Sequence, residues 1–319
     1  MMTDFPAAII AATRKKISAF LRRDFIKPAA YFILLLLTYY LGYLSAVSKN
    51  PLCEPHRHYS TTTTTSTNTT NMINPPSQAA AVDHYQFQTR CGDPIPSQLI
   101  RQSILNRVFN GTSPYHAFPQ PHIKPLLRQQ RIKGWGSTGA VFKNLIHKVR
   151  PKTIIELGTF LGASAIHMAE LTRQLGLDTQ ILCIDDFRGW PGLPTQFRDI
   201  KMVNGDTMLM YQFMQNVVQF NATEAIIFMP FSTGSALETL CEWGVTGDLI
   251  EVDAGHDFHS AWSDINRAYK LLRPGGVIFG HDYFTVADNR GVRRAVNMFA
   301  RVNGLRVKAD GQHWVLGSF

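Results

Sequence analysis

The sequence has 319 residues, of which 45% are apolar and 17% are charged. This apolar content can form a sizeable core, so a wholly disordered chain is excluded. Four cysteines in a chain of this length exclude a disulfide-rich miniature scaffold. The formal net charge is +9, but no long basic stripe follows residue 30, so the sequence does not predict a partner made of nucleic acid.

Residues 29–47 form an uncharged run, AAYFILLLLTYYLGYLSAV, that would span about 28 Å as a helix. Six basic residues precede it within residues 1–30, so the positive-inside rule places residues 1–28 in the cytosol as a basic tail. We expect a single-pass type II membrane protein anchored by residues 29–47. A cleaved signal peptide and an organellar transit peptide are the alternatives.

Residues 48–83 are rich in Ser, Thr and Pro and predict a disordered stem, either O-glycosylated or a plain linker. Residues 84–150 are interrupted by prolines and are expected to form a neck with short helices. N-glycosylation sequons at Asn68, Asn110 and Asn221 all follow the anchor and agree with a lumenal body.

The four cysteines divide into two groups. Cys53 and Cys91 flank the stem and could pair in an oxidising compartment. Cys183 and Cys241 fall within a predicted strand and helix, where buried free thiols are the default interpretation.

Short apolar runs alternate with helical spacing throughout residues 151–319. Strands are expected at 153–157, 181–184, 225–229, 248–252 and 277–279, with helices between them and a closing hairpin at 305–309 and 314–316. This order predicts an α/β fold: a Rossmann-like doubly wound sheet, mostly parallel, with an antiparallel last strand. Ligands bind such sheets outside the carboxyl ends of the strands, and polar residues recur at each of these ends.

The first strand runs into Glu156-Leu157-Gly158-Thr159-Phe160-Leu161-Gly162-Ala163-Ser164, and the fourth into Asp253-Ala254-Gly255-His256. With Leu272-Arg273-Pro274-Gly275-Gly276 and His281-Asp282-Tyr283, these motifs resemble those of class I S-adenosylmethionine (SAM)-dependent methyltransferases, in the O-methyltransferase-like branch. The resemblance covers about 40% of the chain. A nicotinamide-dependent dehydrogenase would need the G-x-G-x-x-G pattern, which the first turn lacks.

The resemblance implies a role for each matching residue. Glu156, Gly158, Gly162 and Ser164 would line the methionine end of SAM, while Asp185 would bind the ribose and Ser232 would lie near the adenine. Asp253 would face the sulfonium and the acceptor. His256 and His281 are the candidates for the general base, because an imidazole can take a proton near neutral pH.

Asp253 and Asp282 are also similar to the two aspartates that hold a divalent cation in catechol-type O-methyltransferases. This sequence departs from that pattern, because Tyr283 follows Asp282 where that family has asparagine. A Mg²⁺ site at Asp253 and Asp282 is therefore left open.

The pattern of anchor, stem and catalytic body favours an enzyme that methylates an oxygen of a glycan or an acidic polysaccharide in the Golgi lumen. Two alternatives stay open: a small-molecule O-methyltransferase tethered to a membrane, and a non-catalytic scaffold of a glycan-modifying complex. The sequence does not define the acceptor or the oligomeric state.

Overall fold

The computed structural model describes residues 33–41, 90–129, 131–190 and 192–317. Residues 33–41 are helical and exposed, and the rest of the predicted anchor 29–47 lies outside the described residues, as do the predicted tail and stem. Within the described residues, no helix combines the length and hydropathy needed to cross a membrane.

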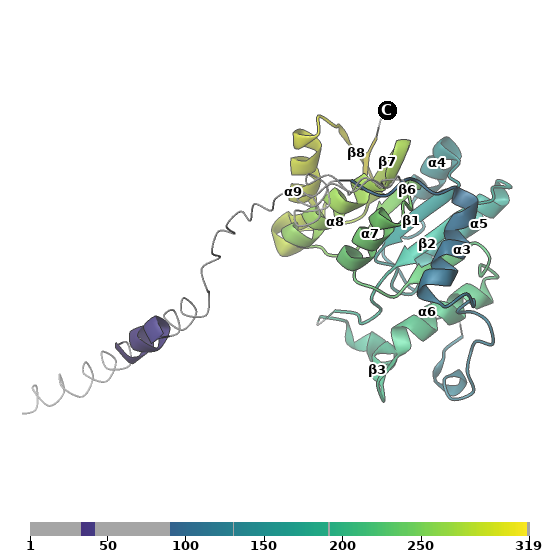
Figure 1. The fold of residues 1–319 in the computed structure, drawn as a ribbon, viewed down its shortest axis with the longest axis horizontal. Coiled ribbons are helices and arrows are strands. Elements are labelled where there is room, and N and C mark those ends of the chain that lie inside the picture. Colours follow the sequence, from purple (N-terminus) through teal and green to yellow (C-terminus); the bar gives the residue numbers. More distant parts are fainter. Residues whose placement is uncertain (1–32, 42–89, 130, 191, 318–319) are drawn as a thin grey trace, which may run out of the picture. The chain divides into compact units, whose positions relative to one another are not determined.

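The body is built on a seven-stranded sheet with the order β5-β2-β1-β6-β7-β9-β8 (Figure 1). Its first five strands are parallel, and β9 runs antiparallel to β7, as the sequence predicts. The order reverses beside β1, between β2 and β6, which defines the switch point at which such sheets bind ligands. The strands are β1 (Thr153–Leu157), β2 (Gln180–Ile184), β5 (Ile226–Met229), β6 (Gly247–Val252), β7 (Leu272–Gly280), β8 (Val307–Asp310) and β9 (His313–Leu316).

Helices cover both faces of the sheet, because alternate residues of each buried strand point to opposite sides. One core contains side chains of α3, α7, α8 and α9, and the other contains side chains of α4, α5 and α6. Their bounds are α3 (Ser97–Val108), α4 (Ala140–Val149), α5 (Ala163–Gln174), α6 (Met208–Gln219), α7 (Thr233–Glu242), α8 (Phe258–Lys270) and α9 (Ala287–Val302).

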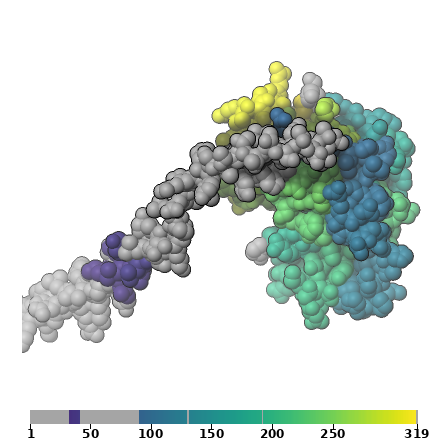
Figure 2. Space-filling model, in the orientation of Figure 1, coloured from purple at the N-terminus to yellow at the C-terminus, as the bar shows by residue number. Residues whose placement is uncertain are grey.

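The described part of the predicted neck, from residue 90 on, packs with the body as one unit. Ile100 and Ile104 of α3 are fully buried in the core, and Arg101 donates hydrogen bonds to the carbonyl oxygens of Thr223 (2.8 Å) and Glu224 (3.1 Å). Figure 2 shows the blue residues of this region along one side of the body. The sequence motifs begin at Glu156, so they mark only part of the folding unit.

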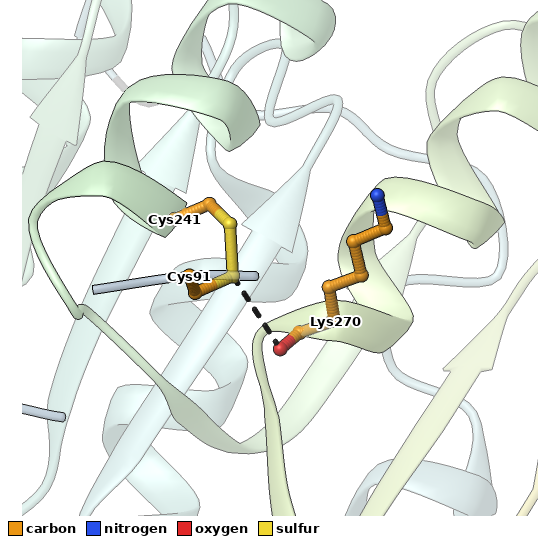
Figure 3. The surroundings of a disulfide bond; sticks show 3 residues. All are labelled: Cys91, Cys241 and Lys270. Carbon is orange, nitrogen blue, oxygen red and sulfur yellow. Dashed lines mark hydrogen bonds between the residues drawn. A yellow bond between two sulfur atoms is a disulfide. The ribbon is translucent and has the colours of Figure 1, made fainter. Parts of the chain in front are cut away.

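A disulfide joins Cys91 to Cys241, at the end of α7 (Figure 3). The prediction of a free thiol at Cys241 is therefore wrong, and Cys91 has a partner other than Cys53, which lies outside the described residues. Cys183 is a buried free thiol, as expected. The pairing could not be read from the sequence, because the two cysteines are 150 residues apart.

Asp248 ties the amino ends of three strands together. Its Oδ2 accepts hydrogen bonds from the backbone N–H groups of Lys152 and Thr153, each 2.8 Å long. Its Oδ1 lies 3.1 Å from Nη1 of Arg273 on β7. This carboxylate therefore links β6 to both of its neighbouring strands.

Two segments differ from the sequence-based expectation. The predicted loop at 187–204 contains a 3₁₀ helix, η2 (Thr195–Ile200), and the first strand of a small hairpin made by β3 (Met202–Val203) and β4 (Asp206–Thr207). β7 starts at Leu272 rather than at residue 277, because its pairing with β6 continues through Pro274-Gly275-Gly276 with a shift in register.

Candidate functional site

The turn after β1 depends on two glycines with positive φ. Gly158 has φ +84° and Gly162 has φ +81°, a region that glycine enters at no steric cost. A Cβ added at Gly158 would lie 2.0 Å from the carbonyl oxygen of Asp253, and one at Gly162 would lie 2.9 Å from the ring of Phe213. The first turn and the end of β6 are therefore in direct contact, which fits a site shared by both.

Glu156 lies beneath this turn rather than at its surface. Its side chain is fully buried, and it accepts hydrogen bonds from the hydroxyl groups of Thr159 (2.7 Å) and Ser164. The predicted contact of Glu156 with the methionine end of a cofactor remains a prediction. The two hydrogen bonds accepted by Glu156 hold both ends of the glycine turn in place.

Asp185 joins the ends of β1 and β2. Its two carboxylate oxygens accept hydrogen bonds from the backbone N–H groups of Phe160 (2.8 Å) and Phe187 (2.7 Å). Burial raises the pKa of Asp185, while these hydrogen bonds oppose the shift. Each oxygen retains a second lone pair, so Asp185 can still accept hydrogen bonds from the two hydroxyl groups of a ribose.

Ser232, predicted near an adenine, is the N-cap of α7. Its Oγ accepts a hydrogen bond from the backbone N–H of Ser235 (3.4 Å) and donates one to Oγ of the same residue (3.0 Å). It is exposed at the carboxyl end of β5, so its position is compatible with the predicted role.

Three side chains at the ends of β6 and β7 come together. Asp253, His256 and Asp282 each offer a ligand atom, and these atoms lie within 4.8 Å of one another. Nε2 of His256 is 3.0 Å from Oδ2 of Asp282 and 3.9 Å from Oδ1 of Asp253. All three are partly exposed, so a molecule at this edge of the sheet could reach them.

The two carboxylates change the titration of the histidine. Asp253 makes the largest contribution and, with the charge of Asp282, raises the pKa of His256. Burial alone would raise the pKa of Asp282, but His281, the hydroxyl of Thr285 and the charge of His256 lower it to about 2. Asp282 is therefore ionised at any physiological pH.

His281 is placed differently from His256. It is only 8% exposed, its Nδ1 lies 3.4 Å from Oδ2 of Asp282, and its ring lies 4.8 Å from that of His313. Burial lowers its pKa and Asp282 raises it, with a net upward change. Of the two predicted bases, His256 is the one that an acceptor can reach more easily.

Asp253, His256 and Asp282 are also candidate ligands for a divalent cation. The sequence left Asp253 and Asp282 open as possible ligands, and in the structure His256 lies beside them. Two carboxylates and an imidazole suit Mn²⁺ or another transition metal better than Mg²⁺, which prefers oxygen ligands. The donor set fits a cation, and the adjacent pair His281-Asp282 gave no signal that His256 would join it.

A comparison with known protein families agrees with the motifs found in the sequence. Residues 155–283 match the sequence model of a family described as a methyltransferase domain. No curated protein matches the chain in sequence.

Similar solved structures include a cofactor-bound protein, Rv0187 from MTB, with 19% identity over 71% of this chain and 99% of that chain, at a TM-score of 0.45. The O-methyltransferase TomG from Streptomyces achromogenes, solved with SAM, has 14% identity over 76% of this chain and 99% of its own, at a TM-score of 0.42. An O-methyltransferase from Bacillus cereus, solved with SAH, has 15% identity over 68% and 96%, at a TM-score of 0.40.

The domain match, on top of the glycine turn and the acids that follow β2 and β6, defines the class of protein. It is a SAM-dependent methyltransferase, and the match to the methyltransferase domain covers residues 155–283.

Proposed function

We propose that this protein transfers a methyl group from SAM to an oxygen of a glycan or acidic polysaccharide, as a single-pass type II enzyme of the Golgi lumen. The observation that carries the proposed chemistry is the position of His256, which lies close to the carboxylates of Asp253 and Asp282. The backbone of Asp253 in turn contacts the glycine turn at Gly158. Oxygen acceptors need a group that takes their proton as the bond to carbon forms, and a partly exposed imidazole can do so.

In the proposed reaction, the acceptor oxygen attacks the methyl carbon of SAM in line with the sulfonium. The new O–C bond forms as the S–C bond breaks, and the sulfur keeps the electron pair in S-adenosylhomocysteine. Nε2 of His256 faces the ionised carboxylate of Asp282 and donates its own proton to it, so the proton of an acceptor hydroxyl passes to Nδ1. The neighbouring carboxylates stabilise the imidazolium that results. A carboxylate acceptor would have no proton to lose, so it would need positioning alone.

A divalent cation is a second arrangement of the same residues. Asp253, His256 and Asp282 would hold it, and it would supply electrostatic stabilisation of an ionised acceptor oxygen. His256 would then be a ligand, and the proton would leave by another route.

Several features support the proposed lumenal location. The Cys91–Cys241 disulfide is typical of proteins that mature in an oxidising compartment. Asn110 and Asn221, the two sequon residues that are described, are both exposed. The uncharged run at 29–47 and the basic residues before it remain the argument for the anchor.

The test of the chemistry uses the purified protein and SAM labelled at the methyl group. We expect label to enter an acidic polysaccharide acceptor, and His256→Ala to reduce the rate by about 10²–10⁴-fold, the usual contribution of a general base. Treating the product with mild alkali would release label from a methyl ester but not from an ether. Full activity of His256→Ala, with SAM binding unchanged in calorimetry, would contradict the assigned base.

The test of topology uses expression in secretory cells. We expect an N-glycan-removing enzyme to increase the gel mobility of the protein, and the shift to shrink stepwise in Asn110→Gln and Asn221→Gln. A protein without N-glycans, whose body is digested by protease from the cytosolic side, would reverse the proposed orientation.

A further inference from the structure

Four aromatic rings gather beside the glycine turn. Trp135, Phe160, Trp190 and Phe197, which we call the aromatic platform, have ring centroids between 5.3 and 6.2 Å apart in five pairs. Phe197 is buried at the base, whereas Trp135 and Trp190 are each 45% exposed. Large exposed aromatic side chains in contact with one another commonly mark a binding surface.

The segment that carries Trp135 lies between the start of α5 and His281, the residue before Asp282. A Cβ added at Gly134 would lie 2.9 Å from Cβ of Ala163, at the start of α5, and one at Gly136 would lie 2.5 Å from Nε2 of His281. Trp135 stands between these two glycines, so it bridges the glycine turn and the end of β7. A chain of sugar rings reaching the reactive edge could therefore extend over the platform.

Hydrogen bonds hold the platform to the cofactor side of the site. Nδ2 of Asn216 donates to the carbonyl oxygens of Arg131 (3.0 Å) and Leu161 (2.9 Å), which joins the segment before Trp135 to the glycine turn. Phe160 has φ +51°, an unusual conformation for a residue with a side chain, and its N–H is fixed by Asp185. Local strain of this kind is commonly retained at functional sites.

The segments that carry the platform are basic. Residues 128–139 and 186–201 contain six basic residues against two acidic ones, Asp186 and Asp199. Each acid already lies close to arginines: Asp186 to Arg188 at 2.6 Å, and Asp199 to Arg131 at 2.7 Å. Lys133, Arg198 and Lys201 are exposed, so the field over the platform favours an anion.

We propose that the aromatic platform binds consecutive sugar rings of an acidic, uronate-containing glycan and determines acceptor specificity; this proposal rests on the function proposed above. The C–H faces of the sugar rings would pack on Trp135 and Trp190, because aromatic faces are negative and attract polarised C–H groups. The uronate carboxylates would pair with the surrounding basic side chains. Neither ring carries out chemistry, so both are positioning residues.

The test measures binding without turnover. Wild-type protein is titrated with tetragalacturonic acid, with its fully methyl-esterified neutral form and with caffeic acid, and the quench of tryptophan fluorescence is confirmed by calorimetry. We expect the acidic tetramer to bind best and its affinity to fall with added salt. Trp135→Ala and Trp190→Ala should each weaken it at least 10-fold, and Lys133→Glu should weaken the acidic form but not the neutral one.

The control is Phe220→Ala, which removes a 43% exposed ring at the end of α6. It should leave tetramer binding unchanged, and melting temperatures would identify any platform variant that fails to fold. A milder variant, Trp135→Leu, keeps the bulk of the side chain and should still weaken binding.

The outcomes separate this proposal from the proposed reaction. Equal affinity for the acidic and neutral tetramers, preferential binding of caffeic acid, or unchanged binding in the Trp135→Ala/Trp190→Ala double variant would each overturn the platform proposal. Tetramer binding that depends on the platform, in the absence of any methyl transfer to it, would support the platform and contradict the proposed reaction. SAM binding should be the same in all these variants.

Discussion

Glu156 and Glu251 lie in register on the adjacent strands β1 and β6, and neither side chain is more than 1% exposed. Glu156 has two hydroxyl partners, whereas Oε2 of Glu251 has no hydrogen-bond partner among the described residues. Burial, followed by the charges of Glu156 and Asp253, raises the pKa of Glu251 well above its ordinary range. We therefore expect the carboxyl group of Glu251 to stay protonated in the folded protein.

The pair predicts how stability depends on pH. The folded state keeps the proton of Glu251 above pH 4.5, where the unfolded chain releases it, so stability falls as pH rises through this window. Glu251→Gln removes the titration and should stabilise the protein by about 1–3 kcal/mol near neutral pH, with no gain near pH 4. Thermal melting from pH 4 to 8 measures this, and exposed Glu242→Gln is the control. A gain independent of pH would contradict the explanation.

Gly158→Ala tests the contact between the first turn and β6. The added Cβ would meet the carbonyl oxygen of Asp253 at 2.0 Å, so we expect lost stability and SAM binding weakened at least 10-fold. Gly176→Ala is a matched control, since it also has positive φ (+61°) but open space around its Cβ. Gly176→Ala should lower the free energy of unfolding by only about 1 kcal/mol and leave SAM binding intact. Equal effects at the two positions would show that φ alone matters.

Asp253→Asn tests the side chain at the end of β6. The two side chains are nearly isosteric, so the melting temperature should stay within about 2 °C. The rate of methyl transfer should fall much more than SAM affinity, because the lost interaction would act mainly in the transition state. A variant in which affinity and rate fall together would assign Asp253 to cofactor binding. Lower stability with both functions intact would remove it from the site.

Titration with Mn²⁺ tests whether the three clustered residues hold a cation. We expect Mn²⁺ to raise the melting temperature of the wild type and to have no effect on Asp282→Asn, which lacks one ligand. Asp186→Asn is the control, because this carboxylate pairs with Arg188 outside the cluster. A shift that survives in Asp282→Asn would place the ion elsewhere.

Cys91→Ser/Cys241→Ser should lower the free energy of unfolding by about 2–5 kcal/mol, the usual cost of losing a native disulfide. A reductant should lower the melting temperature of the wild type to the same value and leave the double variant unaffected. An identical melting temperature for the wild type with and without reductant would show that this bridge does not support the fold.

Much of the fold could be predicted from the sequence because its signals are local. Apolar runs located six of the seven main strands to within two residues at each end, and helical spacing predicted the helices between them. β7 starts five residues before its predicted position. The hairpin of β3 and β4 was missed, since strands of two residues carry no periodic pattern. The partner of Cys91 was missed because it depends on how α7 packs against a segment 150 residues away.

The site was predictable at the level of strand ends but not of contacts. Asp253 and Asp282 could be placed together because β6 and β7 are neighbours in this topology. The approach of His256 to Asp282 depends on the path of a loop, and the burial of Glu156 depends on the two hydroxyl groups that close over it. Trp135 and Trp190 lie outside the motifs, so nothing in the sequence alone related them to Phe160.

The carboxylate of Asp248 links β1, β6 and β7 at their amino ends. His256 and the aromatic platform lie at the carboxyl ends of the strands. Part of the strand alignment is thus secured at the amino ends, away from the candidate site. Natural variation could then alter which acceptor is methylated while the scaffold stays the same. Related chains with different substrates would be expected to diverge at positions such as 135 and 190 long before they lose the carboxylate at 248.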